Sequence, residues 1–305
     1  MCCLFGLIDP QQRLTGNQKS RIMHTLAIAA EARGTDATGV AYTAGGRIVI
    51  HKAPVAGRRL RFSLRDDTVT AMGHTRMATQ GSAKLGRNNH PFCGHLEGGH
   101  TFALAHNGVL YNDADLRRTL RLPKPRIETD SFVAVQLLQT RKALDFNSLK
   151  YMAEKVEGSF TFTVLDEQNA LYIIKGDSPF YLLRWPSLGL YLYASTEQIM
   201  LTALKGIGLS FRGAVKVALI SGEIIRIDHD GSITRATFDD SGIYSCFAPY
   251  SFDLGCGCRL AKRSDRTYMD ELKSVAASFG YTPEMIDRLI ERGYTTDEIE
   301  EFLYI

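Results

Sequence analysis

Cysteine and proline are scarce in this chain, and it has no long apolar run. The 305 residues include 6 cysteines and 9 prolines. So few cysteines exclude a disulfide framework, and the overall composition excludes a disordered or fibrous protein. No apolar stretch approaches the roughly 20 residues that a membrane-spanning helix needs. The sequence therefore indicates an ordinary globular protein with one or two domains.

An excess of charge of one sign is also lacking. Lysine and arginine together number 36 against 33 acidic residues, which gives a net charge of +3. This balance gives no reason to expect nucleic acid or a membrane as a partner. The residues after Met1 lack the basic and apolar regions of a signal peptide, so we expect a cytoplasmic protein. The glycine-rich stretch 94–99 lacks the Lys-Ser/Thr ending of a phosphate loop, so we expect no nucleotide cofactor.

The pattern of apolar residues predicts many strands with a few helices between them. Residues 2–8 include no charged or strongly polar side chain, which predicts a strand covered on both faces. A helix is expected at 18–33 and a hairpin at 38–52. Further β-type runs lie at 69–75, 101–106, 159–166, 170–175, 180–184, 190–194, 215–220 and 223–228, and helical patterns at 113–120, 130–143 and 147–155. This arrangement is typical of an α+β domain with large, mostly antiparallel sheets.

The composition changes near residue 240, and we divide the chain into three parts there. Residues 1–240 form the main domain, and residues 241–264 are expected to be a linker. Residues 265–305 contain a 13-residue repeat that predicts two short helices. A helical unit of about 40 residues is too small to be stable alone, so we expect it to dock on the main domain or on a partner.

Three of the cysteines, Cys246, Cys256 and Cys258, lie in the linker. No second cysteine pair or nearby histidine completes a tetrahedral zinc set around them. We therefore predict no metal site.

Cys2 has the most distinctive chemical position in the chain. Removal of Met1 would leave a cysteine that carries both a thiol and a free α-amino group. Because the reference pKa of an α-amine is near 8, this amine can take the thiol proton and later pass it to a leaving amine. Cys3 has no free amine, and strand alternation directs it to the opposite face. Position alone also fits a start methionine followed by small residues that simply pack in a strand.

Five segments follow Cys2 in an order that resembles a known family. They are Arg33–Gly39, Gly73–Gly81, Asn89–Phe92, Ala105–Gly108 and Glu128–Asp130. Over residues 2–235 the pattern is similar to the glutaminase domain of the class II, N-terminal-nucleophile glutamine amidotransferases, which occurs in glucosamine-6-phosphate synthase and amidophosphoribosyltransferase. The resemblance implies a four-layer αββα sandwich. It also implies that the chain hydrolyses the side-chain amide of L-glutamine to glutamate and ammonia.

The chemistry of this reaction suits the residues that match the family's motifs. The side chain of Asn107 and the backbone N–H of Gly108 would stabilise the oxyanion. Arg76 would pair with the α-carboxylate of glutamine, and Asp130 with its α-ammonium group. The Asn107-Gly108 pair is expected in a turn after a β-type run, and on its own it also fits a plain hairpin turn. Asp130 also fits the N-cap of a helix.

Further matches imply weaker roles. The carbonyl of Gly34 would lie near the N-terminal amine, and Met77 and Thr79 would line the backbone end of the substrate. Three other residues, Asp36, His74 and His90, are expected to hold loops together and not to touch the substrate. The sequence departs from the commonest family pattern at Cys3, Met77 and Gln80. These departures are expected around the substrate pocket, where they put its tightness and the coupling to an acceptor in question but not the hydrolytic step.

The acceptor of the ammonia is not evident in this sequence. Only about 65 residues follow position 240, which is too few for an isomerase or a phosphoribosyltransferase domain. We therefore expect a separate acceptor protein. Two alternatives stay open: an N-terminal-nucleophile hydrolase that acts on another amide, and a catalytically idle domain of this fold that serves as a binding module.

Overall fold

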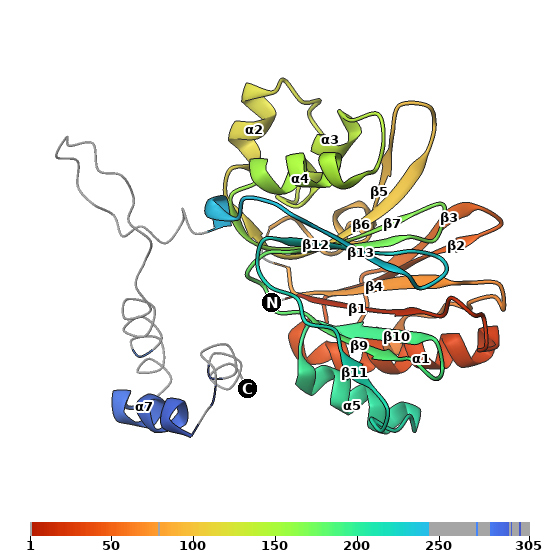
Figure 1. Cartoon of the computed structure of the whole chain (residues 1–305). Coiled ribbons are helices and arrows are strands. Elements are labelled where there is room, and N and C mark those ends of the chain that lie inside the picture. The colour runs from red at the N-terminus through yellow and green to blue at the C-terminus, as the bar shows by residue number, and fades with distance from the viewer. Residues whose placement is uncertain are drawn as a thin grey trace. The chain divides into compact units, whose positions relative to one another are not determined.

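The computed structural model describes residues 2–78, 80–243, 273, 281–292, 294 and 299. The chain divides into two compact units, residues 1–248 and 249–305, which are treated separately below. The first unit stacks helices and sheets in four layers (Figure 1).

One of the two central layers is a seven-stranded sheet. Its strands lie in the order β11-β9-β10-β1-β4-β2-β3, and each of these neighbouring pairs is antiparallel. They are β1 (Cys3–Ile8), β2 (Ala37–Ala44), β3 (Arg47–Ala53), β4 (Thr70–Arg76), β9 (Tyr181–Trp185), β10 (Leu190–Ala194) and β11 (Val215–Lys216). The chain therefore places its first strand in the middle of this sheet.

The other central layer is a six-stranded antiparallel sheet in the order β13-β12-β8-β7-β6-β5. Its strands are β5 (Phe92–His95), β6 (Thr101–Leu110), β7 (Gly158–Asp166), β8 (Leu171–Lys175), β12 (Glu223–Ile227) and β13 (Ile233–Thr237). Strand β6, which carries the predicted oxyanion donors, pairs with β7 over nine residues.

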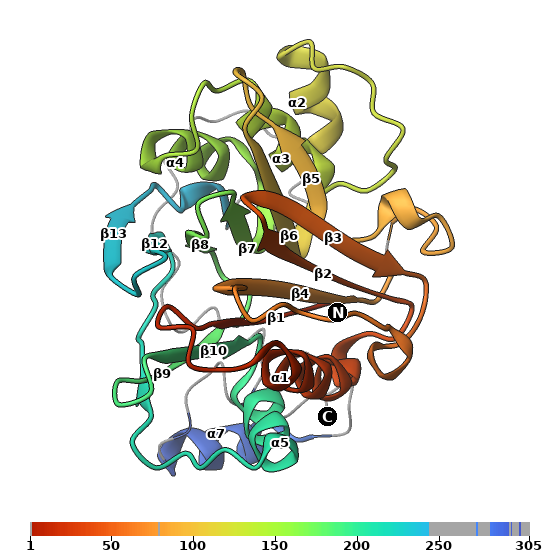
Figure 2. The ribbon, with the colours of Figure 1, turned by 90° about the vertical axis from the view of Figure 1, so that its right-hand side faces the viewer.

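Helices cover the outer face of each sheet, as Figures 1 and 2 show. Helices α1 (Gly16–Ala29) and α5 (Glu197–Ile207) lie on the seven-stranded sheet. Helices α2 (Asp113–Thr119), α3 (Phe132–Gln139) and α4 (Phe146–Lys155) lie on the six-stranded sheet. Short 3₁₀ helices occur at Ala30–Arg33, Gly57–Arg59, Gly86–Asn88 and Ser241–Ile243.

Three apolar layers hold these four layers together. Phe5 and Leu7 of β1 pack with α1 and α5, whereas Leu4 and Ile8 of the same strand face the other sheet. A third cluster joins the six-stranded sheet to α2, α3 and α4. Strand β1 is thus buried on both faces, as its sequence predicts. The αββα sandwich that the sequence predicts is confirmed.

Several predicted elements differ in their limits. The first helix begins at Gly16, where Thr15 and Gln18 form a capping box, and it changes to a 3₁₀ helix at Ala30. The helix expected at 130–143 spans only Phe132–Gln139, and the strand expected at 215–220 is formed only by Val215 and Lys216. Three elements, β5, α5 and β13, were not predicted from the sequence.

A buried ion pair fixes the start of α1. Lys19 Nζ lies 3.3 Å from Asp9 Oδ2, and both side chains are at most 1% exposed. The same ammonium donates to the carbonyl oxygens of Asp66 and Thr68 at 2.7 and 2.6 Å. The charge is therefore fully hydrogen-bonded, which a buried lysine requires.

The second unit contains helix α7 (Pro283–Glu291). Ile286 of α7 is buried and packs with Ile299, the equivalent position of the 13-residue repeat. The linker cysteines and most of the second predicted helix lie outside the described residues. Within the part of the chain that is described, no helix combines the length and the apolar character needed to cross a membrane.

Candidate active site

Cys2 lies at the start of β1, beside the end of β4. Cys3 pairs with Thr75, so the antiparallel register brings Cys2 next to Arg76. The thiol of Cys2 contacts the carbonyl oxygen of Met77 at 3.6 Å, and Arg33 Nε donates to the Cys2 carbonyl at 2.9 Å. Burial raises the pKa of the Cys2 thiol, while the positive charge of Arg76 lowers it in part and the negative charge of Asp130 raises it further. Cys3 is fully buried in the layer beneath α1, as strand alternation predicts.

A small cavity adjoins the Cys2 thiol. It measures about 10 Å³ and is lined by Cys2, Arg76, Met77, Gln80, His90, His106, Gly108, Thr129, Asp130 and Ser131. This volume corresponds to about one water molecule.

Arg76 is buried at the end of β4 and faces both the cavity and the loop that follows. Its Nη1 donates to Asn89 Oδ1 at 2.7 Å, and its Nη2 donates to the carbonyl oxygens of Gln80 and Gly81, the latter at 3.1 Å. The guanidinium group is therefore held in a fixed orientation by Asn89 and by the loop. Because a guanidinium carries five N–H donors in a planar fork, it retains capacity for a carboxylate partner.

Asp130 precedes α3 but does not cap it. Its Oδ2 accepts the backbone N–H of Leu110 at 2.7 Å, which ties the carboxylate to the end of β6. Its Oδ1 lies 3.3 Å from the hydroxyl of Ser131, and that hydroxyl lies 2.8 Å from His106 Nδ1. The alternative of a helix N-cap is therefore wrong, since the carboxylate bonds to the neighbouring strand.

Asn107 and Gly108 lie within β6 and not in a turn. They pair with Thr161 and Phe160 of β7, so both the expected turn and the alternative of a plain hairpin turn are wrong. Gly108 has φ +134°, and a Cβ there would overlap the Ser159 carbonyl, so only glycine fits. The side chain of Asn107 is buried and does not line the cavity.

The hydroxyl of Ser195 contacts the side chain of Asn107. Asn107 Nδ2 donates to Ser195 Oγ at 3.4 Å, and the backbone N–H of Leu4 donates to the same oxygen at 2.8 Å. Ser195 therefore links the predicted oxyanion donor to β1, the strand that follows Cys2. No sequence pattern pointed to Ser195, because it is 88 positions from Asn107 and belongs to no motif.

Of the positions with weaker expected roles, Met77 lines the same cavity. Gly34 packs so closely on the backbone of Arg76 and Met77 that a Cβ would come within 2.6 Å of the Met77 nitrogen. The side chain of Met77 is 53% exposed. Asp36 accepts the backbone N–H of Ala78 at 2.8 Å, which confirms that it holds this loop. Thr79 lies outside the described residues.

Three buried histidines lie close together at the cavity: His90 and His106 line it, and His74 lies next to His90. The rings of His74 and His90 have centroids 4.3 Å apart, and those of His90 and His106 are 6.4 Å apart. His74 Nε2 donates to the His106 carbonyl at 3.0 Å, so His74 joins β4 to β6. Burial lowers the pKa of all three, to about 3 for His74. These side chains are therefore neutral near pH 7.

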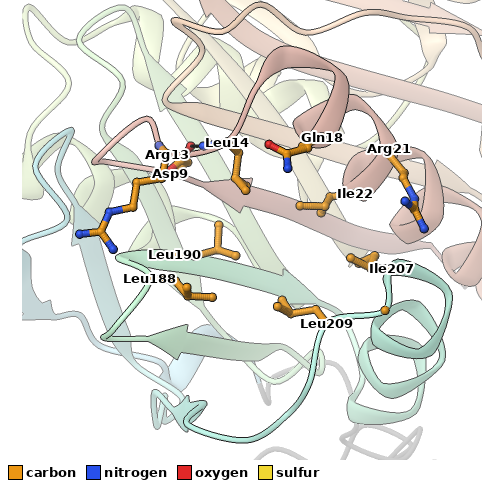
Figure 3. Close-up of a pocket in the computed structure, with 11 residues that line it drawn as sticks. Asp9, Arg13, Leu14, Gln18, Arg21, Ile22, Leu188, Leu190, Ile207 and Leu209 are labelled. Carbon is orange, nitrogen blue, oxygen red and sulfur yellow. Dashed lines mark hydrogen bonds between the residues drawn. The ribbon is translucent and has the colours of Figure 1, made fainter.

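A larger cavity of about 220 Å³ lies elsewhere, between the start of α1, the end of α5 and the β9–β10 hairpin (Figure 3). Its wall is mainly apolar and includes Ile22, Leu190 and Leu209, with Arg13 and Arg21 at its edge. Asp9, which also borders it, is engaged by Lys19. No cysteine, serine or histidine lines this cavity, so it lacks the nucleophile of the Cys2 site. Among the described residues, no cluster of three or more His, Cys, Asp or Glu side chains could hold a metal ion.

Comparison with known families identifies a similar domain. Residues 74–202 match the family described as the glutamine amidotransferase domain. The chain is 31% identical over 159 residues to glutamine–fructose-6-phosphate aminotransferase [isomerizing] of Streptococcus agalactiae, and 28% identical over 260 residues to the Caulobacter vibrioides enzyme of the same name. These matches cover 49% and 79% of this chain but only 26% and 37% of the two relatives. Most of the length of each relative therefore has no counterpart here.

Solved structures show the same fold. The glutamine phosphoribosylpyrophosphate amidotransferase of B. subtilis, solved with ADP and GMP, superposes with a TM-score of 0.59 at 21% identity. A structure described as the allosteric regulatory enzyme of purine biosynthesis has a TM-score of 0.62 at 20% identity. Each match covers 78% of this chain and 49% of the other chain.

Proposed function

Because the chain carries a glutaminase domain of the class II glutamine amidotransferases, we propose that it hydrolyses glutamine with Cys2 as the nucleophile. The observation that supports this proposal most strongly is the shared cavity of Cys2, Arg76, Gly108 and Asp130. These residues come from four separate segments, and each suits a different part of one glutamine molecule.

The first half of the reaction forms a thioester. With Met1 removed, the α-amine of Cys2 accepts the thiol proton, and the sulfur attacks the side-chain carbonyl carbon of glutamine. The negative charge on the carbonyl oxygen is stabilised by the side-chain amide of Asn107 and the backbone N–H of Gly108. The protonated amine then gives its proton to the departing nitrogen, so that the C–N bond breaks and ammonia leaves.

The second half of the reaction regenerates the enzyme. Water attacks the glutamyl thioester, the C–S bond breaks, and the α-amine transfers the water proton to the sulfur. Glutamate and the free thiol of Cys2 result. In both halves Arg76 pairs with the α-carboxylate and Asp130 with the α-ammonium group, so the substrate stays in place while its side chain changes.

The test combines intact mass with an activity assay. We expect purified protein to lack the mass of Met1 and to release glutamate and ammonia from glutamine in a 1:1 ratio. Protein that retains Met1 should be inactive, because its Cys2 nitrogen is part of a peptide bond. Hydrolysis of other amides but not of glutamine would favour a different hydrolase of this fold, and processed protein with no amide hydrolysis would favour a binding module.

The acceptor of the ammonia is proposed to be a separate protein. The two relatives named above are aminotransferases, and this chain matches only 26% and 37% of their lengths. Residues 281–305 carry seven acidic and two basic side chains, which suits docking on a basic surface. In this organisation residues 1–240 are the glutaminase domain, 241–264 the linker and 265–305 a helical docking extension.

A further inference from the structure

Two buried polar side chains of the Cys2 cavity, His90 and Thr129, make no hydrogen bond to any residue that the structure describes. They are only 4% and 2% exposed. Both ring nitrogens of His90 and the hydroxyl of Thr129 lack a hydrogen bond within the described part of the chain. A buried polar group without a partner costs free energy, so such groups are rare and call for an explanation. The sequence predicted that His90 holds a loop, but no such bond is present among the described residues.

The surroundings of His90 keep its imidazole neutral. The ring packs between His74 and Phe92, with both centroid distances 4.3 Å. Burial lowers the pKa of His90 well below its ordinary value, and the positive charges of Arg76 and Lys52 act in the same direction. A neutral imidazole has one nitrogen with a lone pair, which accepts a hydrogen bond from a donor. His90 can therefore bind a cationic group without repelling it.

Thr129 directly precedes Asp130, and both residues line the cavity. Asp130 already accepts the Leu110 N–H through Oδ2, but a carboxylate has about four lone-pair sites and retains capacity at Oδ1. The cavity thus presents three kinds of acceptor: a carboxylate oxygen, a hydroxyl oxygen and a ring nitrogen.

We propose that His90 and Thr129 bind the α-ammonium group of glutamine together with Asp130. An ammonium group on a carbon has three N–H donors, and the three acceptors can take one each. This inference rests on the proposed function, since it adds two contacts to the same substrate. It makes His90 and Thr129 determinants of specificity for amides that carry a free ammonium group.

The test compares glutamine with 4-carbamoylbutanoate, which has the same amide and carboxylate but no ammonium group. Rates are measured for the wild-type chain, His90→Phe and Thr129→Val. We expect kcat/KM for glutamine to fall by about 10-fold to 100-fold in each variant, mainly through KM, because each loses a hydrogen bond to a charged group. The kcat/KM for 4-carbamoylbutanoate should stay within about twofold of wild type.

Conservative variants and a buried control complete the experiment. His90→Gln and Thr129→Ser keep an acceptor and should recover most of the preference for glutamine. Thr163→Val changes a fully buried threonine of β7 that does not line the cavity, and it should leave the preference unchanged. Because valine and threonine have nearly the same shape, Thr129→Val gives a result even if His90→Phe fails to fold.

Two outcomes would overturn the inference. Equal losses on both substrates would mean that His90 and Thr129 support the fold or hold a reacting water, and an unchanged preference for glutamine would mean that they do not contact the ammonium group. Failure of the proposed function has a different signature, since processed wild-type protein would then hydrolyse neither compound. In that case calorimetric binding of glutamine and 4-carbamoylbutanoate to the same variants decides whether the ammonium contact exists.

Discussion

The side-chain amide of Asn107 donates a hydrogen bond to the hydroxyl of Ser195 at 3.4 Å. Asn107 belongs to the six-stranded sheet, and Ser195 follows β10 of the seven-stranded sheet. Because Ser195 Oγ also accepts the backbone N–H of Leu4 at 2.8 Å, one hydroxyl joins the nucleophile's strand to the proposed oxyanion donor. A carboxamide nitrogen has two hydrogens, so the bond to Ser195 leaves the second hydrogen of Asn107 unused.

Replacement of Ser195 should therefore affect the chemical step. In Ser195→Ala the amide of Asn107 loses a fixed orientation, and we expect kcat for glutamine to fall by about 10-fold while KM changes little. Steady-state kinetics measure both values. A rise in KM with an unchanged kcat would show that Ser195 acts on substrate binding and not on the oxyanion donor.

The two adjacent cysteines should respond differently to substitution. Cys2→Ser should lower glutamine hydrolysis by about 10³-fold or more, because the weaker hydroxyl nucleophile replaces the thiol. Cys3→Ala should keep most of the activity, since Cys3 is buried beneath α1 and away from the cavity. Glutamate release by each variant is the measurement, and the opposite ranking would remove Cys2 as the nucleophile.

Substitutions of residues proposed to contact opposite ends of the substrate should affect kcat and KM differently. Asn107→Ala should lower kcat by about 100-fold or more, because oxyanion donors act in the transition state. Arg76→Ala and Asp130→Ala should raise KM by about 10-fold or more, because their contacts already form with bound glutamine. Since Arg76 also holds the loop carbonyls of Gln80 and Gly81, some loss of kcat is expected there. Unchanged KM values in both variants would exclude Arg76 and Asp130 from the site.

The buried histidines should make stability depend on pH on the acidic side. The pKa of His74 is lowered to about 3 in the fold, whereas an unfolded histidine titrates near 6.5. Below about pH 6.5 the unfolded chain binds a proton that the folded chain does not, so stability falls as the pH decreases toward 3. The loss is about 1.4 kcal/mol per pH unit for this one histidine.

Urea unfolding at several pH values between 7 and 5 tests this prediction. His74→Gln keeps a donor for the His106 carbonyl but does not titrate, so its stability should fall less steeply than that of the wild-type chain. If the free energy of unfolding falls equally steeply with decreasing pH in both proteins, His74 does not contribute to the pH dependence of stability.

Lys19 should be one of the most sensitive positions for stability. In Lys19→Met the buried carboxylate of Asp9 loses its countercharge, which costs about 3–5 kcal/mol. Arg58→Met is the matched control, since Arg58 pairs with Glu31 at 3.0 Å but is 67% exposed. Its free energy of unfolding should change by about 1 kcal/mol or less. Urea titrations measure the free energy of unfolding of both variants. Similar losses for Lys19→Met and Arg58→Met would contradict this prediction.

The main sandwich was largely predictable because its strands carry local signals. β1 is apolar at every position, and β2 and β3 flank Ala44-Gly45-Gly46, so periodicity and turn residues were sufficient. Helix α5 also had signals, since Thr196 caps its start and Gly208, with φ +75°, ends it. It was missed because its start directly follows the buried strand β10. The limits of α3 were misjudged because apolar spacing does not show where a helix begins.

Motifs in the sequence indicated candidate site residues but not their geometry. The motifs identified Cys2, Arg76 and Asp130, whose shared cavity appears only when β1, β4 and the start of α3 come together. The contacts of Ser195 and the lack of partners for His90 depend on residues far apart in the sequence. Such relationships follow from sheet register and packing, which a single sequence does not reveal.

The two sheets meet mainly through an apolar layer that includes Leu4, Met72 and Ala105. Apolar packing has no directional preference. The lateral position of one sheet relative to the other is therefore set by how the shapes of these side chains fit together. Cys2 directly precedes β1 of one sheet, and Asn107 and Gly108 lie on the other. A shear of about 1 Å between the sheets would therefore move the proposed nucleophile away from the proposed oxyanion donors. Natural selection would therefore act on this layer for the alignment of the catalytic groups as well as for stability, although none of the three side chains lines the cavity.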